Sequence, residues 1–379
     1  MMRVGLMLLI AFIFPLALRP EAANTWPFWT SYESHFLSAE GRVADPDRNS
    51  MTTSEGQSYA MFFALVAGDA PAFERIRAWT ESNLAHGDFA ANLPAWSWGK
   101  SSEGAWRVLD QNSASDADLW IAYSLIQAGR LWQKPAYTRS GQALLKRIAN
   151  EEVAWLPGTG PILAPGRVEL FSTPGRWVLN ESYLPLPLLI AAAHAAPDGP
   201  WKQMATALPG WLERASPAGF AMDWVEEYNG SFAPTRNPGD SSRPACGSYD
   251  AIRVYLWAGL TDKETPGAER ILQVFAPMAK LMKSRAMPPE LVAPNGVVLS
   301  KSSPVGFSAA LLPFLAASGD SAGAKEQLRL VTAQLDPKTG LLGTHPRYYD
   351  QNLALFGLSW QEQRFRFAPD GELRVRWKN

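Results

Sequence analysis

Six segments of the chain are apolar almost without interruption over several helical turns, and this feature constrains the fold most strongly. They begin at Thr53, Asn112, Asn180, Gly247, Val305 and Tyr348. Each opens with small, polar or tyrosine residues and then carries hardly any charge. A surface helix needs a polar face, whereas a helix that is apolar on all sides is buried. The chain therefore contains six helices that other parts of the chain must cover.

A second set of segments is amphipathic, with apolar residues at helical spacing and charges on the opposite face. They begin at Thr25, Pro71, Ala136, Gly199, Gly267 and Ala322. The two sets alternate along the chain, which indicates an inner ring of six helices wrapped by an outer ring of six. The sequence thus predicts an all-α fold, an (α/α)6 barrel.

Short β structures are expected in the long connections. Residues 152–180 and 290–300 are punctuated by glycine and proline, and residues 364–377 alternate around Asp370-Gly371. Such an alternation about Asp-Gly is typical of a β-hairpin. We therefore expect small β-hairpin decorations on the barrel, and no inter-domain linker is apparent.

The N-terminus has the pattern of a secretory signal peptide. Arg3 precedes an apolar run of roughly fifteen residues, which suits a signal sequence and is short for a membrane span. Small residues follow at Ala22 and Ala23. We predict a signal peptide over residues 1–23, with the cleavage point open, and one domain over residues 24–379. An uncleaved anchor is the less favoured alternative because Pro15 interrupts the run. The processed protein is expected to be periplasmic or secreted, without membrane insertion.

Composition excludes several other classes of function. The chain has 35 basic and 36 acidic residues and a net charge of -1, which gives no indication of nucleic acid as a partner. Its four histidines lack the spacing of metal ligands, and no phosphate-binding or dinucleotide-binding fingerprint is present. We expect neither a metal ion nor a cofactor. The single cysteine, Cys246, excludes an internal disulfide.

The first turns of three apolar segments hold polar residues that are placed to cap a helix. A capping box pairs Ser or Thr with an acidic residue or Gln three positions later. Ser115 with Asp118 and Ser54 with Gln57 fit this pattern, and Ser248 is placed to cap the third segment. We expect these residues to close the helix ends.

Capping leaves Glu55, Asp116 and Asp250 without a role. A single acidic residue in a first turn is explained by the helix dipole. The inner helices of an α/α barrel begin at one rim, however, and three carboxylates gathered there repel one another. Such a group suits glycoside hydrolysis, which needs one protonated carboxylic acid and one ionised carboxylate. We interpret the three residues as a candidate active site.

Aromatic side chains are the expected means of binding sugar. Tryptophan occurs 16 times, and an aromatic ring offers a large apolar surface for stacking. For any one of these residues, burial in the core is the more common outcome. The candidates for the rim are Trp96, Trp98, Trp106, Trp177, Tyr183 and Trp224.

Ala114–Trp132, ASDADLWIAYSLIQAGRLW, resembles the signature of glycoside hydrolase family 8 at every defined position. The segments TSEGQSYAM, PAWSWGK, AMDWV, GSYDAIRVYLW and YYDQNLALFGL extend the resemblance over nearly the whole mature chain. The resemblance implies an (α/α)6 barrel that hydrolyses β-1,4 glycosidic bonds with inversion. With its signal sequence and C-terminal hairpin, the chain most resembles members encoded with bacterial cellulose synthases. This implies a secreted endo-β-1,4-glucanase, a cellulase, that acts on β-1,4-glucan and is associated in function with a cellulose synthase complex.

The resemblance also assigns roles to individual residues. Glu55 matches the general acid, Asp250 the general base that activates water, and Asp116 the aspartate that holds the distorted sugar. Tyr183, Trp96 and Arg253 match positions that line the cleft. Subfamilies differ in where the base lies, and the SYDAIR segment favours Asp250. Inversion requires the two carboxyl groups to lie roughly 6.5–9.5 Å apart.

Two kinds of alternative remain. A xylanase or chitosanase of the same family would use the same carboxylates on another polysaccharide. A non-catalytic periplasmic glucan-binding protein would use the same aromatic cleft, but binding alone does not require the three carboxylates.

Overall fold

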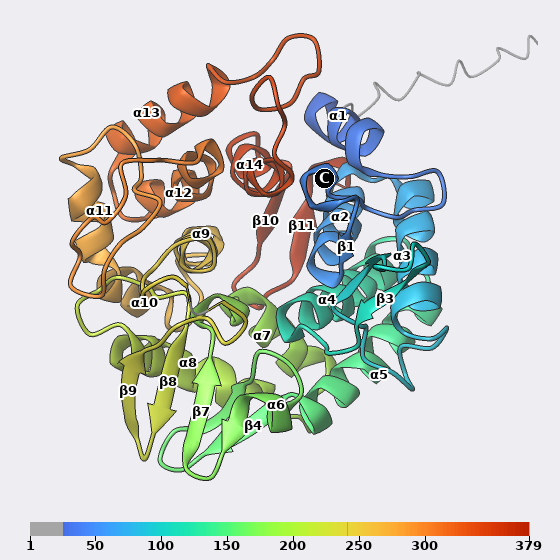
Figure 1. The fold of residues 1–379 in the computed structure, drawn as a ribbon, viewed down its shortest axis with the longest axis horizontal. Helices are drawn as coiled ribbons and strands as arrows, with labels where there is room; N and C mark the ends of the chain where they lie inside the picture. The colour runs from blue at the N-terminus through green and yellow to red at the C-terminus, as the bar shows by residue number, and fades with distance from the viewer. Residues whose placement is uncertain (1–25, 241, 379) are drawn as a thin grey trace, which may run out of the picture.

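Six helices form an inner ring in the computed structural model, which describes residues 26–240 and 242–378 (Figure 1). They are α2 (Ser54–Ala67), α4 (Ser115–Leu131), α7 (Leu186–Ala195), α9 (Ala251–Leu260), α12 (Val305–Ala317) and α14 (Tyr348–Gln361). Their residues are almost all buried, as expected for helices that are apolar on every side. The signal peptide predicted at residues 1–23 lies outside the described residues.

The amphipathic helices form the outer ring, which confirms the predicted (α/α)6 barrel (Figure 1). They are α1 (Pro27–Phe36), α3 (Ala70–Leu84), α5 (Pro135–Glu151), α8 (Trp201–Ala215), α10 (Ala268–Val274), α11 (Ala276–Met282) and α13 (Ser321–Thr332). The segment from Gly267 was expected as one helix but breaks at Phe275. Pro277 explains the break, because proline has no N–H to continue the helical hydrogen bonds.

Helix α7 is shorter than its apolar segment suggests. The segment from Asn180 first forms a short 3-10 turn, η2 (Glu181–Tyr183), and α7 begins only at Leu186. Pro185 precedes that residue and Pro187 follows it, so the chain cannot be helical earlier. In the described part of the chain, no helix has both the length and the apolar character needed to cross a membrane.

Antiparallel strands decorate the connections, as predicted for residues 152–180 and 364–377. A hairpin joins β4 (Val153–Leu156) and β5 (Gly160–Leu163). A four-stranded sheet has the order β6 (Ser172–Thr173), β7 (Arg176–Leu179), β8 (Val225–Tyr228) and β9 (Ser231–Pro234), next to the short helix α6 (Val168–Phe171). Residues 290–300 form no strand, only isolated bridges such as Val292 to Val298.

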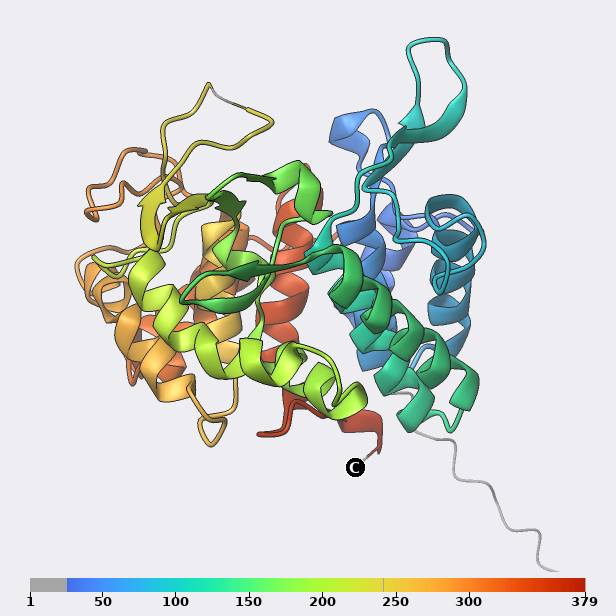
Figure 2. The same ribbon diagram turned by 90° about the horizontal axis from the view of Figure 1, so that it is seen from below.

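The segment around Trp98 forms a further hairpin. Strand β2 (Ser97–Lys100) pairs with β1 (Thr52–Thr53) on one side and with β3 (Trp106–Asp110) on the other. Figure 2 shows the β2–β3 hairpin standing out from one face of the barrel.

The opposite face is closed by the C-terminal hairpin of β10 (Phe365–Phe367) and β11 (Leu373–Val375) (Figure 2). The Tyr123 hydroxyl donates to the Gly371 carbonyl at 2.9 Å, and Trp377 Nε1 donates to the Leu65 carbonyl at 3.0 Å. Both contacts are made in the C-terminal halves of inner helices. The N-terminal ends of the inner helices therefore open toward the face that carries the β2–β3 hairpin.

Candidate active site

The first turn of α2 is closed by a residue other than the one predicted. Thr53 Oγ1 accepts a hydrogen bond from the Gly56 N–H at 3.3 Å. Gln57, expected to pair with Ser54 in a capping box, instead accepts the Val43 N–H at 2.6 Å through Oε1. The capping prediction is therefore wrong here, because Gln57 joins α2 to a distant part of the chain.

The capping box predicted for α4 is also wrong. Ser115 is the first residue of the helix, and its hydroxyl donates to the Ala164 carbonyl at 2.5 Å. Asp118 is fully buried near Glu152 at the end of α5, and neither of its carboxyl oxygens has a hydrogen-bond partner among the described residues. At α9, the Ser248 hydroxyl is buried and caps nothing.

Arg253 of α9 holds two of the three predicted carboxylates together. Its Nη1 donates to Asp116 Oδ2 at 2.9 Å, and its Nη2 donates to Asp250 Oδ1 at 2.5 Å. The same guanidinium donates to Tyr59 Oη and Ser182 Oγ. A buried arginine placed between two carboxylates relieves the repulsion that gathering them would otherwise cause.

Glu55 lies in a different environment, without an ion pair in the described part of the chain. Its Oε1 accepts the Trp96 indole N–H at 3.1 Å, and its Oε2 is buried with no hydrogen-bond partner among the described residues. Burial raises the pKa of Glu55 and outweighs the nearby charge of Arg253, which acts in the opposite direction; the charge of Asp250 acts in the same direction as burial. These surroundings favour a protonated carboxylic acid.

Asp116 and Asp250 differ in exposure although both pair with Arg253. The Asp116 side chain is 2% exposed and that of Asp250 is 26% exposed. Burial raises the pKa of Asp116 to about 7, while Arg253 acts in the opposite direction. Asp250 combines an ion pair with access to solvent, which suits a carboxylate that takes a proton from water.

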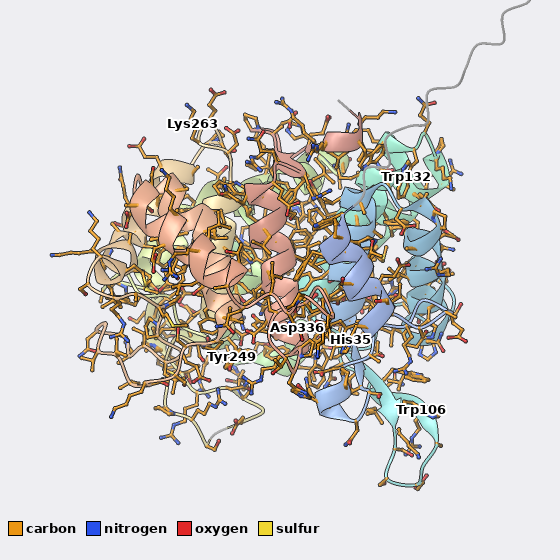
Figure 3. All side chains as sticks on the ribbon, turned by 90° about the horizontal axis from the view of Figure 1, so that it is seen from above. His35, Trp106, Trp132, Tyr249, Lys263 and Asp336 are labelled. Atoms are coloured by element: carbon orange, nitrogen blue, oxygen red, sulfur yellow. The ribbon has the colours of Figure 1, made fainter. Side chains whose placement is uncertain are left out.

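Glu55, Asp250 and Arg253 line one cavity of about 250 Å³. Trp96 also lines it, as predicted for a rim aromatic. The remaining wall includes Arg48, Tyr249, Tyr348, Tyr349 and Asn352. Sequence reasoning did not single out these residues, although the tyrosines that open the apolar segments at residues 249 and 348 were a usable signal. In Figure 3, Tyr249 lies toward the same face as Trp106, and Trp132 and Lys263 lie toward the opposite face.

Two further predicted aromatic residues lie outside this cavity, on the β2–β3 hairpin. Trp98 stacks on Trp106, with ring centroids 5.1 Å apart and an angle of 18° between the planes. The Arg42 guanidinium lies 5.3 Å from the Trp98 ring and 5.1 Å from the Trp106 ring. Trp106 is 48% exposed, so this stack presents an aromatic surface beyond the cavity.

Tyr183 and Trp177 have different positions relative to the carboxylates. The Tyr183 ring centroid lies 5.6 Å from the Arg253 guanidinium, which brings Tyr183 to the site, and Trp224 packs against it. Trp177 lies on β7, partly buried against the hydrophobic core. The structure therefore does not bring Trp177 into contact with the cluster around Arg253.

Comparison with known proteins agrees with this geometry. Residues 4–363 match the family model described as glycosyl hydrolases family 8. An endoglucanase of Xanthomonas axonopodis pv. citri is 44% identical over 383 residues, covering 100% of this chain and 97% of that protein. An endoglucanase of Escherichia coli K12 is 42% identical, covering 97% and 96%.

A solved structure extends the likeness to three dimensions. The crystal structure of an endo-1,4-D-glucanase from Vibrio fischeri ES114 matches with a TM-score of 0.85 and 37% identity, covering 94% of this chain and 100% of that one. Sequence and structure agree over nearly the full length, and the chain therefore belongs to glycosyl hydrolases family 8.

Proposed function

We propose that the chain is an endo-β-1,4-glucanase, a cellulase that cleaves internal bonds of β-1,4-glucan with inversion of configuration. The observation that carries the proposal is the contrast among three gathered carboxyl groups. Glu55 is buried without an ion pair among the described residues, whereas Asp250 is ion-paired and partly exposed beside the same cavity. Inverting hydrolysis needs one group of each kind.

In the proposed mechanism, Glu55 is the general acid. Its proton passes to the glycosidic oxygen as the bond from that oxygen to the anomeric carbon breaks. The raised pKa of Glu55 favours the protonated form that can donate this proton. The Trp96 N–H fixes Oε1 and leaves Oε2 to carry the proton toward the substrate.

Asp250 is the general base in this mechanism. It takes a proton from a water molecule while the water oxygen bonds to the anomeric carbon from the opposite face. Its ion pair with Arg253 orients the carboxylate, and its exposure gives water access. The proposed mechanism requires the carboxyl groups of Glu55 and Asp250 to lie roughly 6.5–9.5 Å apart, which leaves room for the water molecule.

Asp116 is proposed to hold the distorted sugar beside the scissile bond. Its contact with Arg253 supports a second task, because the same guanidinium also orients Asp250. Trp96, Trp98 and Tyr183 are proposed to bind the glucan. Trp177, which lies apart from the cluster, is proposed only as a more distant contact.

A chitosanase is the less favoured alternative, because a cationic polysaccharide calls for an excess of acidic residues. The cavity is lined by Arg48 and Arg253 as well as by Asp45, Glu55 and Asp250, and the net charge of the chain is only -1. A xylan chain would fit the same chemistry, so xylan is the alternative substrate to test.

We also propose that the protein is exported to the periplasm or beyond and acts alongside a cellulose synthase complex. The signal-like pattern at residues 1–23 supports export. Deletion of the coding sequence should alter cellulose yield or fibre form, and unchanged cellulose would contradict this role.

The decisive experiment measures release of reducing ends from a panel of β-1,4 polysaccharides, with NMR of the first anomer formed. We expect cleavage of carboxymethylcellulose and release of the inverted anomer. Glu55→Gln should abolish cleavage while the fold and oligosaccharide binding persist. Glu227→Gln is the matched control, because Glu227 is fully buried on β8 and does not line the cavity. Binding without cleavage by the wild-type protein would support the glucan-binding alternative.

A further inference from the structure

The start of α9 is fixed by a residue from another part of the chain. Asp223 Oδ1 accepts three backbone N–H groups, from Ser248 at 2.7 Å, Asp250 at 3.1 Å and Ala251 at 2.8 Å. The first N–H groups of a helix have no partner within the helix. Asp223 thus caps the start of α9, a role that was expected of the Ser248 hydroxyl. One of the N–H groups that it binds belongs to Asp250, the residue proposed as the general base.

Asp223 is itself held on a rigid segment. Each backbone N–H of residues 221–223 donates a hydrogen bond to a buried partner. The acceptors are, in chain order, Tyr255 Oη at 2.9 Å, Glu181 Oε1 at 3.0 Å and the Cys246 carbonyl at 3.0 Å. Since Tyr255 belongs to α9, the segment and the helix support each other at two points.

The Asp250 carboxylate consequently has two independent anchors. Arg253 holds its side chain from within α9, and Asp223 holds its backbone from outside the helix. The Asp250 side chain is partly exposed and receives no other side-chain hydrogen bond among the described residues. Loss of the backbone anchor would leave the carboxylate free to move about Arg253.

We propose that Asp223 is a positioning residue that fixes Asp250 to take a proton from the attacking water. This inference rests on the proposed role of Asp250 as general base. Misplacing a catalytic group by about 1 Å can lower a rate about 100-fold. Asp223→Ala should therefore lower kcat about 100-fold on carboxymethylcellulose, while KM changes less than about twofold.

Two conservative variants separate position from charge. Asp223→Asn keeps an oxygen acceptor at the same place, so we expect kcat within about threefold of wild type. Asp223→Glu keeps the charge but moves the oxygen by one methylene, so we expect a loss of at least about tenfold. These two variants decide the question even if Asp223→Ala does not fold.

A second capping aspartate provides the matched control. Asp320 Oδ1 accepts the Gly323 N–H at 2.8 Å at the start of the outer helix α13. Asp320→Ala should lower the thermal midpoint and leave kcat unchanged, as expected for a cap with a structural role only.

Two results would overturn the role of Asp223. One is an Asp223→Ala variant with wild-type kcat. The other is a wild-type rate in Asp223→Glu combined with a large loss in Asp223→Asn, since charge rather than position would then matter. A wild-type protein that cleaves no polysaccharide would instead overturn the proposed function itself.

Discussion

Asp118 and Glu152 are neighbouring carboxyl groups, both fully buried, and neither Asp118 oxygen nor Glu152 Oε2 has a hydrogen-bond partner among the described residues. Ser113 Oγ donates to Glu152 Oε1 at 2.5 Å, and neither carboxyl forms an ion pair in the described part of the chain. The nearby charges are Asp116 and Glu55 for Asp118, and Glu151 and Arg167 for Glu152. Two ionised carboxylates buried side by side would repel each other, and burial also disfavours the charged form, so this arrangement favours a proton on the pair.

This pair predicts a loss of stability in alkaline solution. Burial raises the pKa of Glu152 from 4.5 to about 8, so the folded state favours the protonated form. The stabilising contribution is complete below pH 4.5 and disappears as the pH rises through about 8. Glu152→Gln, which cannot titrate, should reduce the fall in unfolding free energy between pH 5.5 and 8.5 by roughly 2 kcal/mol. Urea denaturation at several pH values measures this difference.

The control for that experiment is Glu326→Gln. Glu326 pairs with Arg329 on the surface of α13, and its replacement should leave the pH dependence unchanged above pH 5.5. Parallel stability curves for wild type and Glu152→Gln would contradict the prediction.

Replacing Trp96 with Phe should move the alkaline limb of activity to higher pH. The Trp96 N–H stabilises the ionised form of Glu55 and so lowers its pKa. Without this donor, Glu55 keeps its proton to higher pH, by about half a pH unit for a hydrogen bond of ordinary strength. The measurement is kcat against pH. Trp98→Phe serves as control, because Trp98 stacks on Trp106, and a shift of the limb in that variant would rule out a specific effect of Trp96.

Arg253→Met should destabilise the protein as well as inactivate it. The substitution leaves Asp116 buried without its counter-charge, and breaking a buried ion pair in this way costs about 3–5 kcal/mol. Adding Asp116→Asn should restore part of that stability but no activity. Urea denaturation of the two single variants and the double variant gives the coupling energy. A coupling near zero would mean that the pair contributes little.

Gly56→Ala should displace Tyr348 from the cavity wall. A Cβ atom at this position would lie 2.1 Å from Tyr348 Oη and 3.2 Å from Cζ. We expect kcat to fall about tenfold, because the displaced ring lies beside Glu55. In Gly56→Ala/Tyr348→Phe the closest atom is absent, so the combined loss should be smaller than the product of the two single losses.

Gly210→Ala is the matched glycine control. Gly210 lies in the outer helix α8, and its nearest contact is 3.6 Å from the added Cβ. This substitution should stabilise the protein by about 0.5–1 kcal/mol without affecting kcat. Fully additive losses in the Gly56 and Tyr348 variants would show that the clash is not the cause.

The ring architecture could be predicted from sequence because burial on all sides leaves a strong pattern. The hydrogen bonds at the starts of α2 and α9 could not be predicted in full, since they involve partners distant in the chain. Gln57 looks like a capping residue but binds Val43, and α9 is capped by Asp223 rather than by Ser248. The break between α10 and α11 has a local cause, Pro277, and such a break can be read from the sequence alone.

The candidate site followed the same rule. Three acidic residues could be singled out because helix capping gives them no role, namely Glu55, Asp116 and Asp250. Which of them forms an ion pair depends on Arg253, which reaches Asp116 and Asp250 but not Glu55, and this depends on tertiary structure. Trp177 and Tyr183 were both rim candidates, and the structure brings only Tyr183, which also matched a cleft position of the family, against Arg253.

The C-terminal hairpin leaves the barrel accessible from one face only. With β10 and β11 seated on the far ends of the inner helices, and with buried side chains filling the ring, a polymer has no passage through the barrel. A glucan strand must therefore approach and leave by the face that carries the β2–β3 hairpin, so substrate entry and product release share one route.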